Sequence, residues 1–187
     1  MQATGFFQAL LSALLLLPTV APAQTNLGVA DYTGNEELLR PANLDEWIQT
    51  GAALGSEYNN EPFDPRNPGR IGVVQMEPAA YRYFMANGSY ADGTMFLLSF
   101  YDAESKSDPQ LPGFVQGALV AQEIHVLDKA RFTEGRGFFL FSSPGQASST
   151  KVADGSECVA CHTEHGDLDG TFVQFYPAMR QKLGLAE

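Results

Sequence analysis

Two cysteines and a histidine stand within five residues near the carboxyl end of the chain. Residues 158–162 read C-V-A-C-H, and C-x-x-C-H is the attachment signature of c-type haem. Two thiols one short turn apart can bond to the two vinyl groups on one porphyrin edge, and the adjacent imidazole then supplies the proximal nitrogen to the iron. We therefore predict one covalent haem c, attached through Cys158 and Cys161, with His162 as the metal ligand.

Two other kinds of site compete for these residues. A thioredoxin-like redox pair follows a strand, whereas residues 143–157 are Ser- and Gly-rich and typical of a loop. A zinc site would have to take Cys158, Cys161, His162 and His165 within eight residues, although zinc proteins usually separate two ligand pairs. Haem attachment explains the pattern best.

The opposite, distal face of the iron has few candidate ligands. Four methionines lie in apolar patterns that favour core packing: Met76, Met85, Met95 and Met179. His165 follows His162 by three residues on the same expected helix, so it cannot reach the far side. His125 is the one imidazole that could, as a possible sixth ligand. It shares a strand face with Glu123, and this face either points to solvent or lines the haem pocket.

The amino terminus predicts export. Residues 1–23 contain no charged side chain, and an apolar stretch over 9–17 leads to A-P-A at 21–23, an A-x-A cleavage site. The stretch is too short to span a bilayer. We expect a signal peptide over 1–23 cleaved near Ala23, a flexible leader over 24–36, a single haem c domain over 37–187, and a periplasmic location without a membrane span.

The overall charge limits the partners. The formal net charge is −11, which repels phosphate backbones and argues against nucleic-acid binding. The same charge is compatible with a basic redox partner protein.

Periodicity predicts mostly strands. Alternating apolar residues indicate strands over 71–76, 94–101, 114–127 and 137–142. Helices are predicted from Asn43, where Glu46 completes a capping box, from Pro78 to a stop at Gly88, and over the haem motif. Residues 59–70, 102–113 and 143–155 look like connectors. The fold class is therefore α+β: mainly antiparallel β-sheet with a few short helices, one carrying the haem motif.

Several short sequence motifs, called words below, occur in a fixed order along the whole domain. They are D-E-W at 45–47, E-P-A-A-Y at 77–81, D-G-T at 92–94, R-F at 131–132, C-V-A-C-H at 158–162 and F-V-Q-F-Y-P at 172–177. With these words the chain resembles the cytochrome P-460 and cytochrome c′-β superfamily from about residue 37 to 180. The resemblance implies an antiparallel β protein, often homodimeric, with an open distal site. Cytochromes P-460 oxidise hydroxylamine, whereas c′-β members bind nitric oxide.

One position separates the two branches. In cytochromes P-460 a lysine four residues after the D-G-T word bonds to the porphyrin, and here that position is Leu98. Phe96 and Phe100 share the face of Leu98 and would make the pocket apolar, as in c′-β members. We expect all four lysines to lie in loops or in the tail.

The resemblance also suggests distal polar groups. Glu123 matches the family's distal carboxylate, which serves as a proton acceptor in cytochromes P-460, so the resemblance implies a general base at this position. The family's distal arginine position falls at Gly72, and Arg70 lies two residues earlier on the same strand face. The expected distal pocket is therefore Glu123, Leu98, Phe96, Phe100 and Arg70.

The leading expectation is a c′-β-like protein that binds nitric oxide or a similar small nitrogen or oxygen ligand. One alternative is a haem enzyme that oxidises hydroxylamine or acts as a peroxidase. A second is a six-coordinate electron-transfer cytochrome, with His125 or a methionine on the iron.

Overall fold

The structure is a computed structural model and describes residues 27, 29–34, 37–55, 62–107 and 111–185. The predicted signal peptide lies outside these residues. Part of the predicted leader lies within them, and there Tyr32 and Thr33 form a short strand while Val29 and Ala30 pack against the core.

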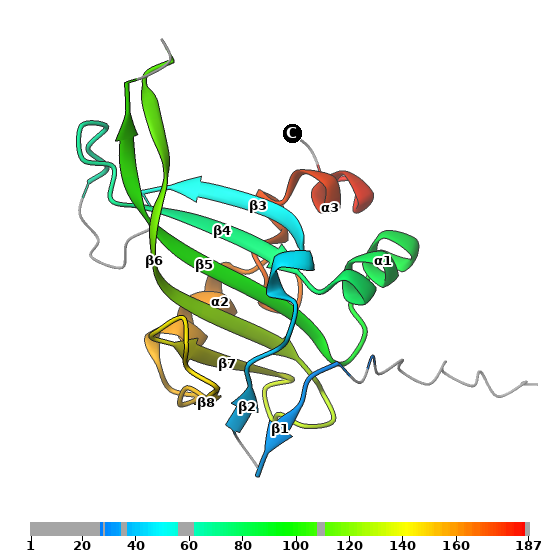
Figure 1. The fold of residues 1–187 in the computed structure, drawn as a ribbon. Helices are drawn as coiled ribbons and strands as arrows, with labels where there is room; N and C mark the ends of the chain where they lie inside the picture. The colour runs from blue at the N-terminus through cyan, green and yellow to red at the C-terminus, as the bar shows by residue number, and fades with distance from the viewer. Residues whose placement is uncertain (1–26, 28, 35–36, 56–61, 108–110, 186–187) are drawn as a thin grey trace, which may run out of the picture.

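Two antiparallel sheets make up most of the fold (Figure 1), which confirms the predicted α+β class. The five-stranded sheet runs in chain order through β3 (Ile48–Leu54), β4 (Arg70–Met76), β5 (Thr94–Lys106), β6 (Gly113–Leu127) and β7 (Arg136–Phe141). The smaller sheet has the order β1 (Tyr32–Thr33), β2 (Glu37–Leu39) and β8 (Ser148–Thr150). Neighbouring strands of the large sheet are therefore neighbours in sequence, as short connections favour.

Short helices join and cover the strands. They are α1 (Pro78–Asn87), α2 (Glu157–His165), α3 (Pro177–Lys182) and the 3-10 turns η1 (Leu44–Glu46) and η2 (Val173–Phe175). Helix α1 begins where the sequence predicts, because Pro78 occupies its first turn and the Glu77 carboxylate accepts a hydrogen bond from the Ala80 N–H at 2.7 Å. It ends at Gly88, whose φ of 71° suits glycine.

The helix predicted from Asn43 is wrong. Only the single turn η1 forms there, Asn43 makes no side-chain cap, and the chain enters β3 at Ile48. Pairing of β3 with β4 satisfies the backbone of this segment, and that tertiary gain overrides a weak local helical pattern. Gly51 in β3 also admits the Tyr176 ring, which would lie 2.8 Å from an added Cβ.

Two expected connectors contain more strand than their polarity suggests. Strands β5 and β6 continue as a paired arm that extends past the sheet at the upper left of Figure 1, with residues 103–106 paired to 113–116. The polar side chains of this arm are tolerated because it has no covered face over most of its length. Residues 143–155 contain β8, which pairs with β2.

Each face of the large sheet packs against other elements over part of its area. One face packs against the small sheet, in a core of Leu38, Trp47, Met95, Leu97, Ile124, Val126, Phe132, Phe139 and Phe141. The other packs against α1, η2 and α3, in a core of Met76, Ala80, Phe84, Tyr90, Phe96, Leu127, Val173, Tyr176 and Met179. Successive residues of β5 alternate between the two cores, so Phe96, Leu98 and Phe100 share the second face. Helix α2 lies behind the sheet in Figure 1, on the side opposite β1 and β2.

No helix in the described part of the chain is long and apolar enough to cross a membrane.

Candidate functional site

Helix α2 presents the two cysteines of the motif. Its first turn is capped by the Ser156 hydroxyl, which accepts a hydrogen bond from the Val159 N–H at 3.4 Å. Val159 is buried and anchors the helix, while Cys158 and Cys161 are exposed and not bonded to each other. Both thiols are therefore accessible to a group that approaches α2.

His162 has one ring nitrogen fixed and the other free. Its Nδ1 lies 2.6 Å from the carbonyl oxygen of Gly170, and because a carbonyl can only accept, Nδ1 must carry the proton and donate. In the neutral ring Nε2 then has a lone pair, and it meets no hydrogen-bond partner among the described residues. A backbone acceptor on one nitrogen is how proteins orient a histidine that binds metal through the other.

A tight return of the chain after α2 places the Gly170 carbonyl. Asp169 and Gly170 have φ of 49° and 72°, conformations that reverse the chain. Gly166 allows the return, because a Cβ there would lie only 2.6 Å from the Gly170 carbonyl carbon and 2.7 Å from the His162 carbonyl oxygen.

Aromatic rings surround His162. Its ring centroid lies 4.6 Å from that of Phe138 on β7, 4.6 Å from that of Phe172 and 5.2 Å from that of His125 on β6. Burial lowers the pKa of His162, the Gly170 hydrogen bond opposes this shift, and the charge of Arg136 adds to the lowering. The ring is therefore held neutral, the form in which it can bind a metal.

His125 is buried beside His162 rather than exposed. Only 8% of its surface is accessible, its ring stacks on Phe138 at 4.3 Å, and its Nε2 is buried without a hydrogen-bond partner among the described residues. Burial, with smaller contributions from His162 and Arg136, lowers the pKa of His125 well below its usual value. The interpretation of His125 as a solvent-facing residue is thus wrong, and the face it occupies is the one that meets α2.

The same sheet face continues beyond His125 as a partly uncovered surface. Leu98 is the cross-strand neighbour of both Val74 and Glu123, and Glu123 in turn pairs with Leu140. All four side chains are at least partly exposed, and we call Val74, Leu98, Glu123 and Leu140 the shelf. Burial raises the pKa of the Cys158 thiol, and the negative charge of Glu123 raises it further. The Glu123 carboxylate therefore lies on the side of the sheet that faces the cysteines.

The other expected pocket residues occupy the margins of the shelf. Phe96 is buried next to His125, with ring centroids 6.3 Å apart, and Phe100 is buried opposite Gly72. Arg70 pairs with Asp102, four residues along β4 from Val74, which separates it from the centre of the shelf by about 13 Å of strand. The register thus does not bring the Arg70 backbone beside Glu123.

A model of the cytochrome P460 family matches residues 41–173, which include the shelf, α2 and Gly170. The chain belongs to the cytochrome P460 family. Membership of this family implies a haem c protein. No curated protein matches the chain significantly.

The site residues of this cytochrome P460 family member fit a haem. The donor set consists of two accessible thiols one turn apart and an imidazole nitrogen left free by the hydrogen bond to Gly170. Three aliphatic residues of the partly uncovered shelf, Val74, Leu98 and Leu140, supply apolar surface of the kind that a porphyrin face contacts.

Sequence reasoning missed the groups that hold His162. Gly170, Phe138 and Phe172 carry no chemistry of their own, and only the pair Gly166 and Gly170 flanking a short turn could have signalled a close approach of the chain.

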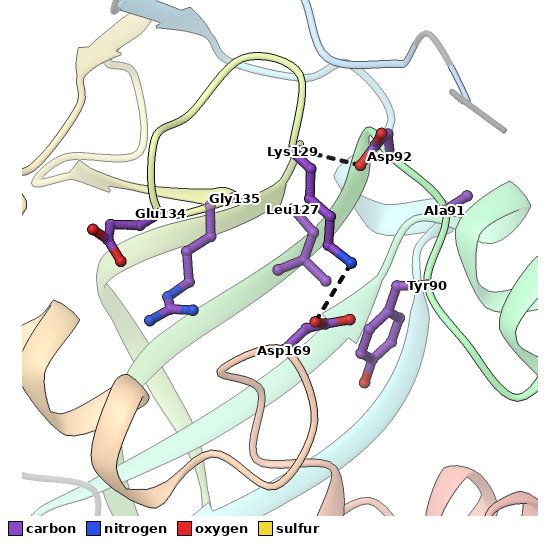
Figure 2. Close-up of a pocket in the computed structure, with 9 residues that line it drawn as sticks. Tyr90, Ala91, Asp92, Leu127, Lys129, Glu134, Gly135 and Asp169 are labelled. Atoms are coloured by element: carbon purple, nitrogen blue, oxygen red, sulfur yellow. Dashed lines mark hydrogen bonds and ion pairs between the residues drawn. The ribbon is translucent and has the colours of Figure 1, made fainter. Parts of the chain in front are cut away.

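A small cavity lies beside this region, lined by Tyr90, Asp92, Lys129 and Asp169 among others (Figure 2). The Lys129 N–H donates to the Asp92 carboxylate at 3.0 Å, and the Lys129 ammonium lies 3.7 Å from Asp169. The cavity has a volume of about 30 Å³, which is room for about one water molecule, so it is not the cofactor site.

Proposed function

We propose that this protein is an exported mono-haem c protein with an open distal position that binds nitric oxide or a similar small ligand. The observation that carries the proposal is the pairing of His162, whose Nε2 is free, with a shelf whose central side chain is the aliphatic Leu98. The uncharged segment over residues 1–23, with its apolar stretch over 9–17, supports export to the periplasm.

Each residue has a distinct task in this proposal. Cys158 and Cys161 would hold the haem covalently, and Gly170 fixes the proton of His162 on Nδ1. When bound, the haem would supply a redox-active iron able to take a small ligand. Leu98 would make the surroundings of that ligand apolar, and the Glu123 carboxylate could accept a hydrogen bond from a protonated ligand.

His125 is poorly placed to close the open position. The ring centroids of His125 and His162 are 5.2 Å apart, and both rings also contact Phe138. The two imidazoles thus pack directly against each other and could not hold one haem between them. We infer that His125 lies on the proximal side.

The methionines are equally unsuited as sixth ligands. Met76, Met95 and Met179 are fully buried in the two hydrophobic cores, and Met85 packs against the second core from α1. Extracting one of them would leave a cavity that costs about 2 to 5 kcal/mol, by analogy with truncation of a buried methionine.

None of the lysines is placed to bond to the porphyrin edge as in cytochromes P-460. Lys129, Lys151 and Lys182 contact Asp169, Asp154 and the Ala86 carbonyl, respectively. The expectation that all lysines lie in loops or the tail is wrong for Lys182, which ends α3, and for Lys106, which ends β5. Lys106 is eight residues along β5 from Leu98, or about 27 Å. The protein should therefore carry an ordinary haem c.

An oxidoreductase that acts on hydroxylamine or peroxide is the rival function, and Glu123 on the shelf is the observation that favours it.

The net charge of −11 supports a basic protein as redox partner, and the family resemblance supports a homodimer.

Absorption spectra of the purified holoprotein test the proposal. We expect high-spin, five-coordinate ferrous haem, a nitric oxide adduct, a denatured spectrum typical of unmodified haem c, and negligible hydroxylamine turnover. A low-spin ferrous spectrum that His125→Phe converts to high-spin would establish the electron-transfer alternative. Turnover that Glu123→Gln abolishes would establish the enzyme.

A further inference from the structure

Arg136, at the start of β7, lies against the loop that orients His162. Its guanidinium donates a hydrogen bond from Nη2 to the Thr163 hydroxyl at 2.6 Å, and Thr163 directly follows His162 in α2. An ideal Cβ on Gly170 would lie 3.1 Å from Nε, Cζ and Nη1 of Arg136, so the plane of the guanidinium covers Gly170. The carbonyl of that glycine is the acceptor for His162.

Arg136 makes no ion pair within the described part of the chain. Glu134 and Asp169 line the same small cavity, but no carboxylate lies within 4 Å of the guanidinium, and its Nε is buried without a hydrogen-bond partner there. Lys129 differs, because it reaches Asp169 at 3.7 Å. The hydrogen bond to Thr163, the residue that directly follows His162, places this charge close to the proximal ring.

We propose that Arg136 is a positioning residue that holds the Gly170 acceptor and whose unpaired positive charge raises the reduction potential of the haem. The reasoning rests on the proposed haem attachment. Ferric haem carries one more positive charge than ferrous haem, so a cation beside the proximal ligand disfavours the ferric form. If the protein binds nitric oxide in the ferrous state, this effect increases the fraction of molecules that can bind it.

The midpoint potential of the holoprotein tests the proposal, measured by spectroelectrochemical titration. Arg136→Gln keeps a side chain able to donate to Thr163 and removes the charge. We expect the ferrous-to-ferric ratio at fixed applied potential to fall about three- to tenfold, or roughly 30 to 60 mV. Arg136→Lys should keep most of the wild-type ratio. The matched control is Arg82→Gln, which removes the same charge from an exposed position on α1, away from α2 (Figure 1).

An unchanged potential in Arg136→Gln, or an equal fall in Arg82→Gln, would overturn the proposal. If Arg136→Gln does not fold, Thr163→Val removes the hydrogen-bond acceptor of the guanidinium instead. It should lower the potential in the same direction by a smaller factor, and no change would again refute the role. If no variant and no wild-type protein carried covalent haem, the proposed function itself would fail; with haem attached, a negative result rejects only the role of Arg136.

Discussion

Replacing Gly166 by alanine tests whether the loop after α2 determines the orientation of His162. Gly166 has a φ of −81°, which alanine adopts without strain, so the substitution acts only through space. The added Cβ would lie 2.6 Å and 2.7 Å from two backbone atoms of Gly170 and 2.7 Å from the His162 carbonyl oxygen. These are backbone atoms, and α2 and the loop must therefore separate by several tenths of an ångström or more.

The cost of that separation follows from two effects. Overpacking of a tight contact costs about 1 to 3 kcal/mol, and weakening of the hydrogen bond between His162 and Gly170 costs about 1 kcal/mol more. We expect Gly166→Ala to lower the free energy of unfolding by about 2 to 4 kcal/mol. For a domain of this size the melting temperature should fall by about 4 to 16 °C.

Gly155→Ala is the matched control, since it lies just before α2 and an added Cβ there meets nothing within 4 Å. It should leave the stability unchanged or raise it by up to about 1 kcal/mol. Thermal unfolding followed by circular dichroism gives the stability, and the iron–histidine stretching band in resonance Raman spectra gives the state of His162. Equal melting temperatures and equal bands for the two variants would refute the reasoning.

Three further predictions address attachment, the distal side and pH. The double substitution Cys158→Ala/Cys161→Ala should abolish haem that resists acid–acetone extraction, and retention of covalent haem would contradict the attachment. Glu123→Gln should change the rates of nitric oxide binding or release severalfold in stopped-flow measurements, whereas unchanged rates would place the carboxylate away from the ligand. Burial raises the pKa of Tyr32 to about 12, partly offset by Arg131, while the unfolded chain ionises near 10.0. The unfolding free energy should therefore decrease as the pH rises from about 10 to 12, and Tyr32→Phe should lessen that decrease; an equally steep decrease in denaturant titrations of the variant would be inconsistent with this cause.

Local signals in the sequence were sufficient for much of the fold and for the attachment residues. Helix α1 follows from Pro78, the Glu77 cap and Gly88, which all act within a few residues of the chain. Strands β4 to β7 of the large sheet follow from alternation, because each side of the sheet buries every second residue. The spacing of Cys158, Cys161 and His162 indicates c-type haem without reference to any other segment.

Only the tertiary structure decided how His162 is held and where His125 lies. The acceptor for His162 is a backbone carbonyl, and any residue type could supply it, so no side-chain pattern predicts Gly170. The burial of His125 depends on α2 covering β6, since the alternation along β6 is equally consistent with a solvent-facing or a pocket-facing histidine.

The segment after Asn43 shows the same limit for secondary structure. Its apolar spacing fits a helix, yet it forms strand β3, because the edge of β4 offers backbone partners that lie 17 residues (Leu54 and Ile71) to 28 residues (Ile48 and Met76) away. The sequence by itself shows which residues are apolar and which can carry chemistry, and its short-range periodicity indicates most of the strands. Long-range pairing and the close approach of backbones determined what those residues face, because both depend on contacts between segments that are distant in the sequence.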